Sequence, residues 1–329
     1  MTEADRSGVP PALTIGVPAS SSEDDLPATL ASLYASALAT GGAVEVMVAV
    51  NGPDEPAAAV AGVAVFAGAH GLPLVAPDQT PPATGSCVRL LRLTQQSKVA
   101  AWNAIRAAAR APIIVFADAD VRIAAAAISL LVGRLRAAPE LAIVAGREVA
   151  LVTPDDGIVA RVAALPHRFD FGNVPGRLYA LRVAALPEAM PPNVLHEDAY
   201  LTVRLGRERF AKEHDAVVYL RPPTTWREYL RQRVRNEVGK LQLTHEFPEL
   251  HRAHGFGRYP WRRFAREIAP REYPLVALSM AARIFARGRA LRQIKQGFRR
   301  GWAVLPSTKR WPGAGPAPSN AGGGTAGRG

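Results

Sequence analysis

The chain has 329 residues, of which 48% are hydrophobic, so it is long enough for one large domain, or one domain with an appendage, around a real core. Its only cysteine, Cys87, excludes an internal disulfide and a four-cysteine zinc site. No run of eighteen uncharged apolar residues is present, and residues 1–11 lack the layout of a signal peptide. We therefore expect a cytoplasmic protein without a membrane-spanning helix.

The first part of the chain alternates short β-branched runs with alanine-rich helical stretches. Strands are expected over residues 13–17, 44–50, 88–93 and 113–117, and helices over residues 25–39, 56–70, 95–110 and 124–137. This alternation predicts a parallel sheet covered by helices on both faces. Ligands of such sheets bind at the carboxyl ends of the strands.

The second half of the chain is less regular and becomes strongly basic. Strands are expected over residues 141–145, 179–182 and 217–220, and helices over residues 196–205, 224–243 and 272–298. Residues 1–200 hold 14 Lys and Arg against 19 Asp and Glu, whereas residues 201–310 hold 25 against 9. This asymmetry indicates an anionic partner, either a membrane surface or nucleic acid, although a solvated Arg-rich face explains it equally well.

Two carboxylates follow the predicted buried strand at residues 113–117. Asp118 and Asp120 share one face of the chain because side chains alternate along a strand. An unpaired buried charge is costly, so acids at this place indicate a function. Their hard oxygen ligands suit Mg²⁺ or Mn²⁺ carrying a diphosphate. The alternative is that Asp120 caps the following helix.

Four segments are informative when they are taken together. They are residues 13–20 (LTIGVPAS), 48–54 (VAVNGPD), 98–103 (KVAAWN) with 116–120 (FADAD), and 196–201 (HEDAYL). Their order and spacing resemble the family 2 glycosyltransferases of GT-A fold over roughly residues 13–243. The resemblance implies an α/β fold, with a mostly parallel nucleotide-binding sheet flanked by helices and a basic helical C-terminal extension.

The resemblance also divides the chain into four parts. We expect a disordered N-terminus at residues 1–12, a GT-A catalytic domain at 13–222, a basic helical region at 223–305 and a disordered tail at 306–329. The tail is predicted from its Gly, Pro, Ser and Ala content.

Donor-side roles follow from the same resemblance. Pro18, Ala19 and Ser20 would border the nucleotide base, and Asn51 would hydrogen-bond the base or ribose. The family often has Asp in place of Asn51, so the identity of the nucleotide base is not predicted. The glycine that follows Asn51 also predicts a tight turn. Lys98 would lie near the diphosphate as a point charge. Because a lysine at a helix N-terminus opposes the helix dipole, an anionic partner for it is favoured.

The remaining carboxylates receive roles by resemblance. Asp118 would contact the nucleotide sugar, and Asp120 would bind the metal. Asp198 would be the general base that deprotonates the acceptor hydroxyl, with Glu197 holding the acceptor or the base. The alternative for Glu197 and Asp198 is an acidic first helical turn. His196 is expected to be a satisfied polar residue, with a contact to a ligand or the acceptor as the alternative.

The basic helices give two further expectations. Residues 232–236 resemble the Gln-x-x-Arg-Trp motif of processive members, with Gln232 and Arg235 on the acceptor or diphosphate side, but Asn236 replaces the Trp. The missing aromatic platform argues against a membrane-embedded polysaccharide synthase, and an Arg-rich surface helix is the alternative. Residues 273–298 fit an interfacial helix on anionic lipid or a helix folded onto the catalytic body, and we prefer the former.

The sequence therefore predicts an inverting, metal-dependent hexosyltransferase. It would move a sugar from a nucleotide-diphosphate sugar to a glycan or lipid-linked acceptor in cell-surface glycan or glycolipid synthesis, with Mg²⁺ or Mn²⁺ as cofactor. We expect peripheral contact with an anionic membrane at its inner face through residues 223–305, and no nucleic acid partner. One rival is a sugar-phosphate nucleotidyltransferase, although residues 18–22 lack its Gly and Arg. The other is a non-catalytic basic adaptor acting through residues 201–310.

Overall fold

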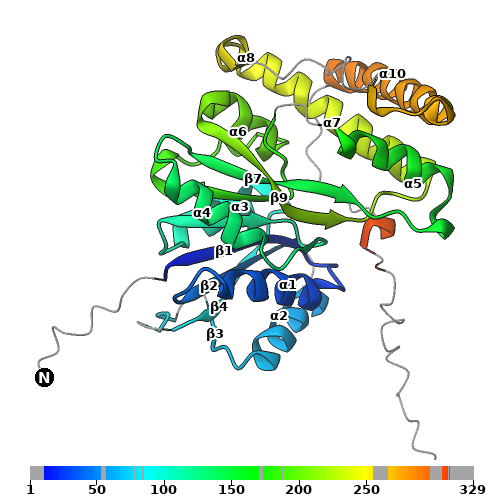
Figure 1. The fold of residues 1–329 in the computed structure, drawn as a ribbon. Coiled ribbons are helices and arrows are strands. Elements are labelled where there is room, and N and C mark those ends of the chain that lie inside the picture. The colour runs from blue at the N-terminus through cyan, green and yellow to red at the C-terminus, as the bar shows by residue number, and fades with distance from the viewer. Residues whose placement is uncertain are drawn as a thin grey trace, which may run out of the picture.

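The computed structural model describes residues 11–52, 57–76, 79–82, 85–169, 173–186, 188–254, 266–296, 306–309 and 311. These residues form an α/β fold. One sheet of parallel and antiparallel strands has helices on both faces and a further layer of helices over one edge (Figure 1). The predicted fold class is confirmed.

The sheet has nine strands in the order β3-β4-β2-β1-β5-β8-β7-β9-β6. Strands β3, β4, β2, β1 and β5 are parallel neighbours, whereas β8 is antiparallel to both β5 and β7. The strands are β1 (Leu13–Ser20), β2 (Val44–Asn51), β3 (Leu74–Val75), β4 (Cys87–Leu93), β5 (Ile113–Ala117), β6 (Arg122–Ile123), β7 (Ile143–Ala150), β8 (Leu178–Arg182) and β9 (Phe210–Leu220).

Helices α1, α2 and α4 cover one face of the sheet, and α3 and α6 cover the other. β1, β2 and β5 are buried along their whole length, which agrees with their largely apolar sequences. The helices of the body are α1 (Leu26–Leu38), α2 (Ala57–Ala69), α3 (Lys98–Ala108), α4 (Ala127–Ala137), α5 (Gly157–Ala164) and α6 (Glu197–Leu205).

A separate layer is formed by α7 (Trp226–Glu246), α8 (Pro248–His254) and α10 (Tyr273–Lys295) (Figure 1). Both long basic helices are confirmed. α5, which the sequence pattern did not reveal, joins this layer to the body, because its Val159 and Val162 pack with Tyr229 of α7 and Leu275 of α10. None of the described helices is long and apolar enough to cross a membrane.

The sequence predicted disorder at both ends of the chain, and the structure bears on only part of that prediction. Residues 1–10 and 312–329 lie outside the described residues. The expectation of disorder is wrong at the start of the tail, because residues Pro306–Lys309 form the 3₁₀ helix η7. Its Ser307 has a hydrogen-bond partner in α7 and its Lys309 has one in the loop after β1, which composition alone does not reveal.

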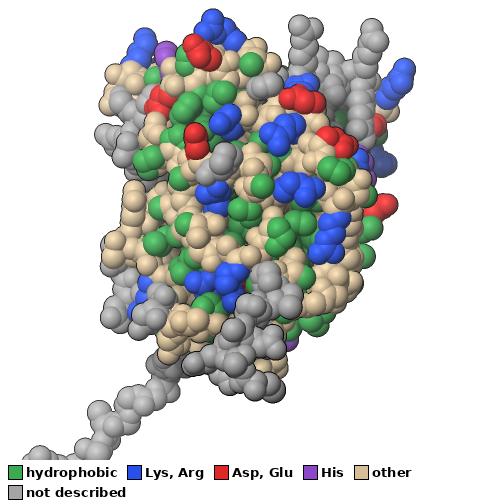
Figure 2. Space-filling model, turned by 90° about the vertical axis from the view of Figure 1, so that its left-hand side faces the viewer, with side chains coloured by type: hydrophobic (Ala, Val, Ile, Leu, Met, Phe, Trp, Pro, Cys, Tyr) green, Lys and Arg blue, Asp and Glu red, His purple; other side chains and the backbone are tan. Residues whose placement is uncertain are grey.

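The surface is mixed on the side that Figure 2 draws. Lys and Arg side chains are spread among apolar and uncharged ones over this face. The face therefore lacks the dense basic stripe that is typical of nucleic-acid binding.

Candidate active site

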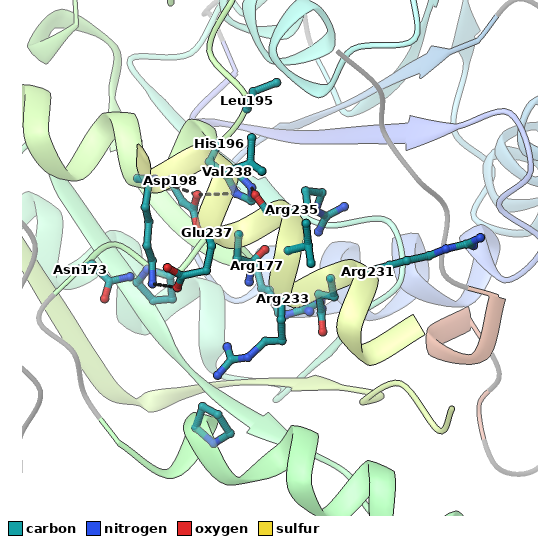
Figure 3. Close-up of a pocket in the computed structure, with 18 of the residues that line it drawn as sticks. Asn173, Arg177, Leu195, His196, Asp198, Arg231, Arg233, Arg235, Glu237 and Val238 are labelled. Carbon is teal, nitrogen blue, oxygen red and sulfur yellow. Dashed lines mark hydrogen bonds and ion pairs between the residues drawn. The ribbon is translucent and has the colours of Figure 1, made fainter. Parts of the chain in front are cut away.

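A cavity of about 1310 Å³ lies between the carboxyl ends of the strands and the α7–α10 layer. Figure 3 shows side chains from the loop before β8, from the start of α6 and from α7 lying around it. Of the predicted site residues, eight line the cavity: Pro18, Lys98, Asp118, Asp120, Glu197, Asp198, Gln232 and Arg235.

Asp118 and Asp120 leave the sheet directly after β5, and the main chain fixes their place. The N–H of Asp118 donates to the carbonyl of Arg177 at 3.1 Å. The guanidinium of Arg177 lies close to both carboxylates, with its Nη1 at 3.6 Å from Asp118 Oδ2 and 3.8 Å from Asp120 Oδ1. Burial alone would raise the pKa of Asp120, but the charges of Lys309 and Arg177 lower it.

Lys98 begins α3 and joins two of the acidic segments. Ser97 caps the helix by accepting from the N–H of Ala100 at 3.2 Å. Lys98 Nζ donates to Asp118 Oδ1 at 2.6 Å and pairs with Glu197. Burial alone would lower the pKa of Lys98, but these two carboxylates raise it well above its ordinary value. The lysine that opposes its helix dipole therefore has anionic partners within the protein.

Glu197 is buried and turned toward Lys98. Burial raises its pKa, while the Lys98 charge opposes that rise. Its contact with Lys98 makes it a positioning residue for the lysine, whereas the sequence predicted that it holds the acceptor or the base.

Asp198 lies in the first turn of α6 and lines the cavity. Its Oδ1 accepts from the N–H of Ala199 at 2.8 Å and lies 3.8 Å from Nδ1 of His196 (Figure 3). Burial raises the pKa of Asp198. A Cβ on Gly176 would lie 3.0 Å from Cβ of Asp198, so the glycine lets the main chain before β8 approach this carboxylate.

His196 is held as a neutral ring. Its Nε2 lies 3.2 Å from the carbonyl oxygen of Arg235, so Nε2 carries the proton and donates it. Burial, helped by the Arg235 charge, lowers the pKa of His196 to about 4. A Cβ on Gly239 would lie 2.0 Å from Cδ2 of His196, so only glycine allows α7 this close. The expectation of a satisfied polar histidine agrees with this geometry.

Arg235 lies on α7 and lines the cavity (Figure 3). Its Nε is buried and has no hydrogen-bond partner among the described residues. Burial lowers the pKa of Arg235, as does the nearby charge of Arg177. A buried guanidinium nitrogen without a partner is costly, so an anion in the cavity would satisfy it.

Three predicted residues lie beside the cavity rather than on its wall. Ala19, Ser20 and Asn51 end β1 and β2 and are buried. The Ser20 hydroxyl donates to Glu23 at 3.1 Å. Both amide atoms of Asn51 are buried without a hydrogen-bond partner among the described residues. This leaves Asn51 as the residue at this edge with unused hydrogen-bonding capacity.

Sequence reasoning missed several charged residues of the site. Arg177 directly follows the glycine of the loop before β8, and that position was its only signal. Its Nε lies 3.9 Å from Glu148, which His167 contacts at 2.7 Å. Burial alone would raise the pKa of Glu148, but His167 and Arg177 lower it to about 2.

The two other missed residues are Glu23 and Lys309. Lys309 Nζ lies 2.5 Å from Glu23 and 3.1 Å from Asp120 Oδ2. Neither residue has a sequence signal, since one stands in a loop and the other in a tail of low complexity.

Few side chains of the cavity are available to bind a divalent metal ion. Within the described part of the chain, no group of three or more His, Cys, Asp or Glu side chains is arranged to hold a metal ion. Asp118 and Asp120 offer hard oxygen donors, which suit Mg²⁺ or Mn²⁺. A metal bound by these two carboxylates would take its other ligands from a diphosphate and water.

Known proteins resemble this chain in part of the sequence and in fold. Residues 14–169 match the family described as glycosyl transferase family 2. No curated protein sequence matches significantly. The mannosyltransferase PcManGT from Pyrobaculum calidifontis, solved with GDP-Man and Mn²⁺, is 18% identical with a TM-score of 0.53, over 91% of this chain and 78% of that one.

Two other solved structures align less well. S. aureus TarS 1–349 in complex with UDP is 12% identical, with a TM-score of 0.45 over 90% of this chain and 94% of that one. A mycobacterial protein is 18% identical, with a TM-score of 0.46 over 71% of this chain and 74% of that one. The likeness to PcManGT concerns the fold, and the family match covers the strands that lead to Asp118 and Asp120. On that match, residues 14–169, slightly under half of the chain, carry the sequence pattern of glycosyl transferase family 2.

Proposed function

We propose that this protein is an inverting glycosyltransferase that moves a hexose from a nucleotide-diphosphate sugar to an acceptor hydroxyl. The observation that carries the proposal is the meeting of Asp118, Asp120 and Asp198 around one cavity. Cationic side chains lie among these acids, and a nucleotide diphosphate needs such charges. The GDP-Man bound by PcManGT gives this proposal a precedent in a similar fold.

Asp198 is the proposed general base. It would take the proton of the acceptor hydroxyl while the hydroxyl oxygen bonds to the anomeric carbon. The bond from that carbon to the diphosphate oxygen breaks on the opposite face, so a single displacement inverts the centre. The raised pKa of Asp198 makes it a better proton acceptor than an ordinary aspartate.

The departing diphosphate gains negative charge, which Lys98, Arg177 and Arg235 would stabilise from fixed positions. Asp118 and Asp120 would hold Mg²⁺ or Mn²⁺, which when bound neutralises part of that charge. Pro18, Ala19, Ser20 and Asn51 would border the base and ribose, with the unpartnered amide of Asn51 as the hydrogen-bonding group.

We further propose that α10 contacts an anionic membrane surface, so that the acceptor is a lipid-linked glycan or glycolipid. Tyr273, Ile284 and Leu291 are exposed, and their spacing of eleven and seven residues puts them on one face of α10. Ile284 is 71% exposed. Arg287 and Lys295 are exposed on the same helix, which is typical of an interfacial helix. The protein would then work in the cytoplasm at the inner face of the membrane.

The test of the donor is a thermal-shift panel of UDP, GDP, CDP and dTDP, each with and without Mn²⁺. A nucleotide at a hundred times its Kd should stabilise the fold by about 2.7 kcal/mol and raise Tm by a few degrees. Assays of the matching nucleotide sugars should then release nucleoside diphosphate. No shift with any nucleotide contradicts the proposal, and release of pyrophosphate from a nucleoside triphosphate would favour the nucleotidyltransferase.

The test of the membrane contact is co-sedimentation with vesicles that contain phosphatidylserine. Ile284→Asn should weaken binding, whereas Leu38→Asn, at a position 53% exposed on α1, should not. Binding that both variants retain equally contradicts a role for α10.

A further inference from the structure

The segment that ends the described chain lies against the donor side of the cavity. Thr308 and Lys309 line the cavity, and the hydroxyl of Thr308 donates to Asp120 Oδ2 at 3.4 Å. Lys309 Nζ bridges Asp120 and Glu23. Lys309, which stands 189 positions after Asp120 in the sequence, thus occupies the charged end of the site, where the proposed function puts a metal and a diphosphate.

All four carboxylate oxygens of Asp118 and Asp120 face a cationic side chain of the protein. Lys98 contacts Asp118 Oδ1, Arg177 lies near Asp118 Oδ2 and Asp120 Oδ1, and Lys309 contacts Asp120 Oδ2. A divalent ion that binds either aspartate must therefore displace or crowd one of these charges. Two like charges on the same oxygen repel strongly in a partly buried site.

The cations differ in how firmly the fold holds them. Lys98 begins α3, whose Val99 and Trp102 are buried in the core, and Arg177 directly precedes the central strand β8. The backbone of each is therefore fixed by a core element. Lys309 belongs to a four-residue helix, and none of the described side chains at residues 307–309 and 311 is a member of a hydrophobic cluster.

Polar contacts are what hold the segment in place. The N–H of Ser307 donates to Glu228 at 3.3 Å, and the hydroxyl of Ser307 accepts from the N–H of Thr224 at 3.2 Å. The guanidinium of Arg122 lies 4.7 Å from the ring centre of Trp311. Such contacts exchange readily with water, so this segment can open locally while the sheet stays folded.

We propose that Lys309 is an internal cation of the donor site, which holds Asp120 and Glu23 until a divalent metal ion takes its place. The inference rests on the proposed role of Asp120 in metal binding. Residues 306–309 and 311 then lie over the site in the absence of metal, and metal binding releases them. Metal and segment compete, so each weakens the binding of the other by the same factor.

The experiment measures Mn²⁺ binding to the full chain without nucleotide, from the electron paramagnetic resonance signal of free Mn²⁺. Lys309→Ala should bind Mn²⁺ about tenfold more tightly than the wild type, within the range of ordinary coupling between sites. Lys309→Arg keeps the charge and should bind like the wild type. Lys295→Ala, which removes an exposed lysine from α10, is the matched control and should also bind like the wild type. Asp120→Asn should bind weakly with either residue at 309.

A second readout follows the segment itself. Trypsin cuts after Lys309 and Arg310, and mass spectrometry of the released tail measures the rate. Mn²⁺ should speed this cleavage in the wild type, whereas Lys309→Ala should be cut quickly at Arg310 with or without Mn²⁺. Thermal melts confirm that the variants fold.

The outcomes separate this inference from the proposed function. Equal Mn²⁺ affinity in the wild type and Lys309→Ala, or weaker binding in the variant, overturns the competition while leaving a metal-dependent transferase intact. Absence of Mn²⁺ binding in both proteins overturns the competition, and absence that persists after a nucleoside diphosphate is added overturns the metal assignment at Asp120 as well. Nucleotide binding is measured separately in the thermal-shift panel, so a panel without any shift would count against the proposed nucleotide-sugar donor alone.

Discussion

The acidic side of the cavity, formed by the strand ends, and the basic side, formed by α7, differ in how their charges are satisfied. On the acidic side, Asp118, Asp120 and Glu148 each have a positive side chain within 4 Å. On the basic side, the buried Nε atoms of Arg233 and Arg235 have no hydrogen-bond partner among the described residues. The strand ends are thus balanced by the protein itself, whereas α7 presents positive charge that a bound anion can satisfy.

This contrast indicates how substrates divide between the two sides. A balanced acidic group gains little from another charge unless that charge displaces one of its internal cations. Asp118 and Asp120 therefore hold positions and exchange cations, while Asp198 accepts a proton. Unsatisfied guanidinium groups gain more, because a phosphate gives them charge-assisted hydrogen bonds. Changes on the acidic side should therefore affect catalysis and folding, and changes on α7 should affect binding.

The largest expected effect comes from Asp198→Asn, which removes the proposed base and keeps the shape. Turnover should fall by about 10²–10⁴-fold, the usual contribution of a general base. Nucleotide binding in the thermal-shift assay should stay unchanged. In the wild type, kcat should decrease as pH falls through the pKa of Asp198, which burial raises above its ordinary value. An asparagine variant with normal turnover would contradict the assignment.

The next effect concerns stability on the acidic side. The pKa of Glu148 is lowered to about 2 from an ordinary value of 4.5, so the folded state favours the ionised form. Its stabilisation is complete above pH 4.5, about 3 kcal/mol, and is lost as pH falls from there toward 2. Urea unfolding at pH 6 should show Glu148→Gln to be less stable by roughly that amount.

The pH dependence provides the control for this prediction. The difference between the wild type and Glu148→Gln should shrink at pH 3, because the wild-type carboxylate then loses its advantage. The exposed Glu140 offers a matched substitution, and Glu140→Gln should follow the wild type at both pH values. A constant difference across this range would show that Glu148 stabilises by packing alone.

On the basic side, Arg235→Ala should raise the KM of the donor by about 10–100-fold, the equivalent of one lost hydrogen bond between charged groups. kcat should change less than after Asp198→Asn. Arg231 lies one turn earlier on α7, is exposed and extends away from Asp198 in Figure 3. Arg231→Ala is therefore the control and should leave the KM of the donor unchanged, while equal effects of both variants would remove the distinction.

The same contrast explains what the sequence could predict. β1, β2 and β5 were predictable because buried parallel strands are largely apolar runs, and Asp118 and Asp120 because they directly follow such a run. Arg177 and Lys309 were not, since a contact over a long sequence separation leaves no local pattern. α5 was missed because eight residues are too few for a helical period to be evident.

The smallest effect tests the start of α7, for which the sequence offered both Thr224 and Thr225 as caps. Thr225 is the N-cap, and its hydroxyl accepts from the N–H of Glu228 at 3.3 Å. Thr225→Ala should lower the free energy of unfolding by about 1 kcal/mol. Thr224 contributes its main-chain N–H to Ser307, so Thr224→Ala keeps that contact and should cost much less. Because α7 carries Arg235, a frayed cap should also weaken donor binding slightly, and equal losses in both variants would show that the cap is not what fixes the helix.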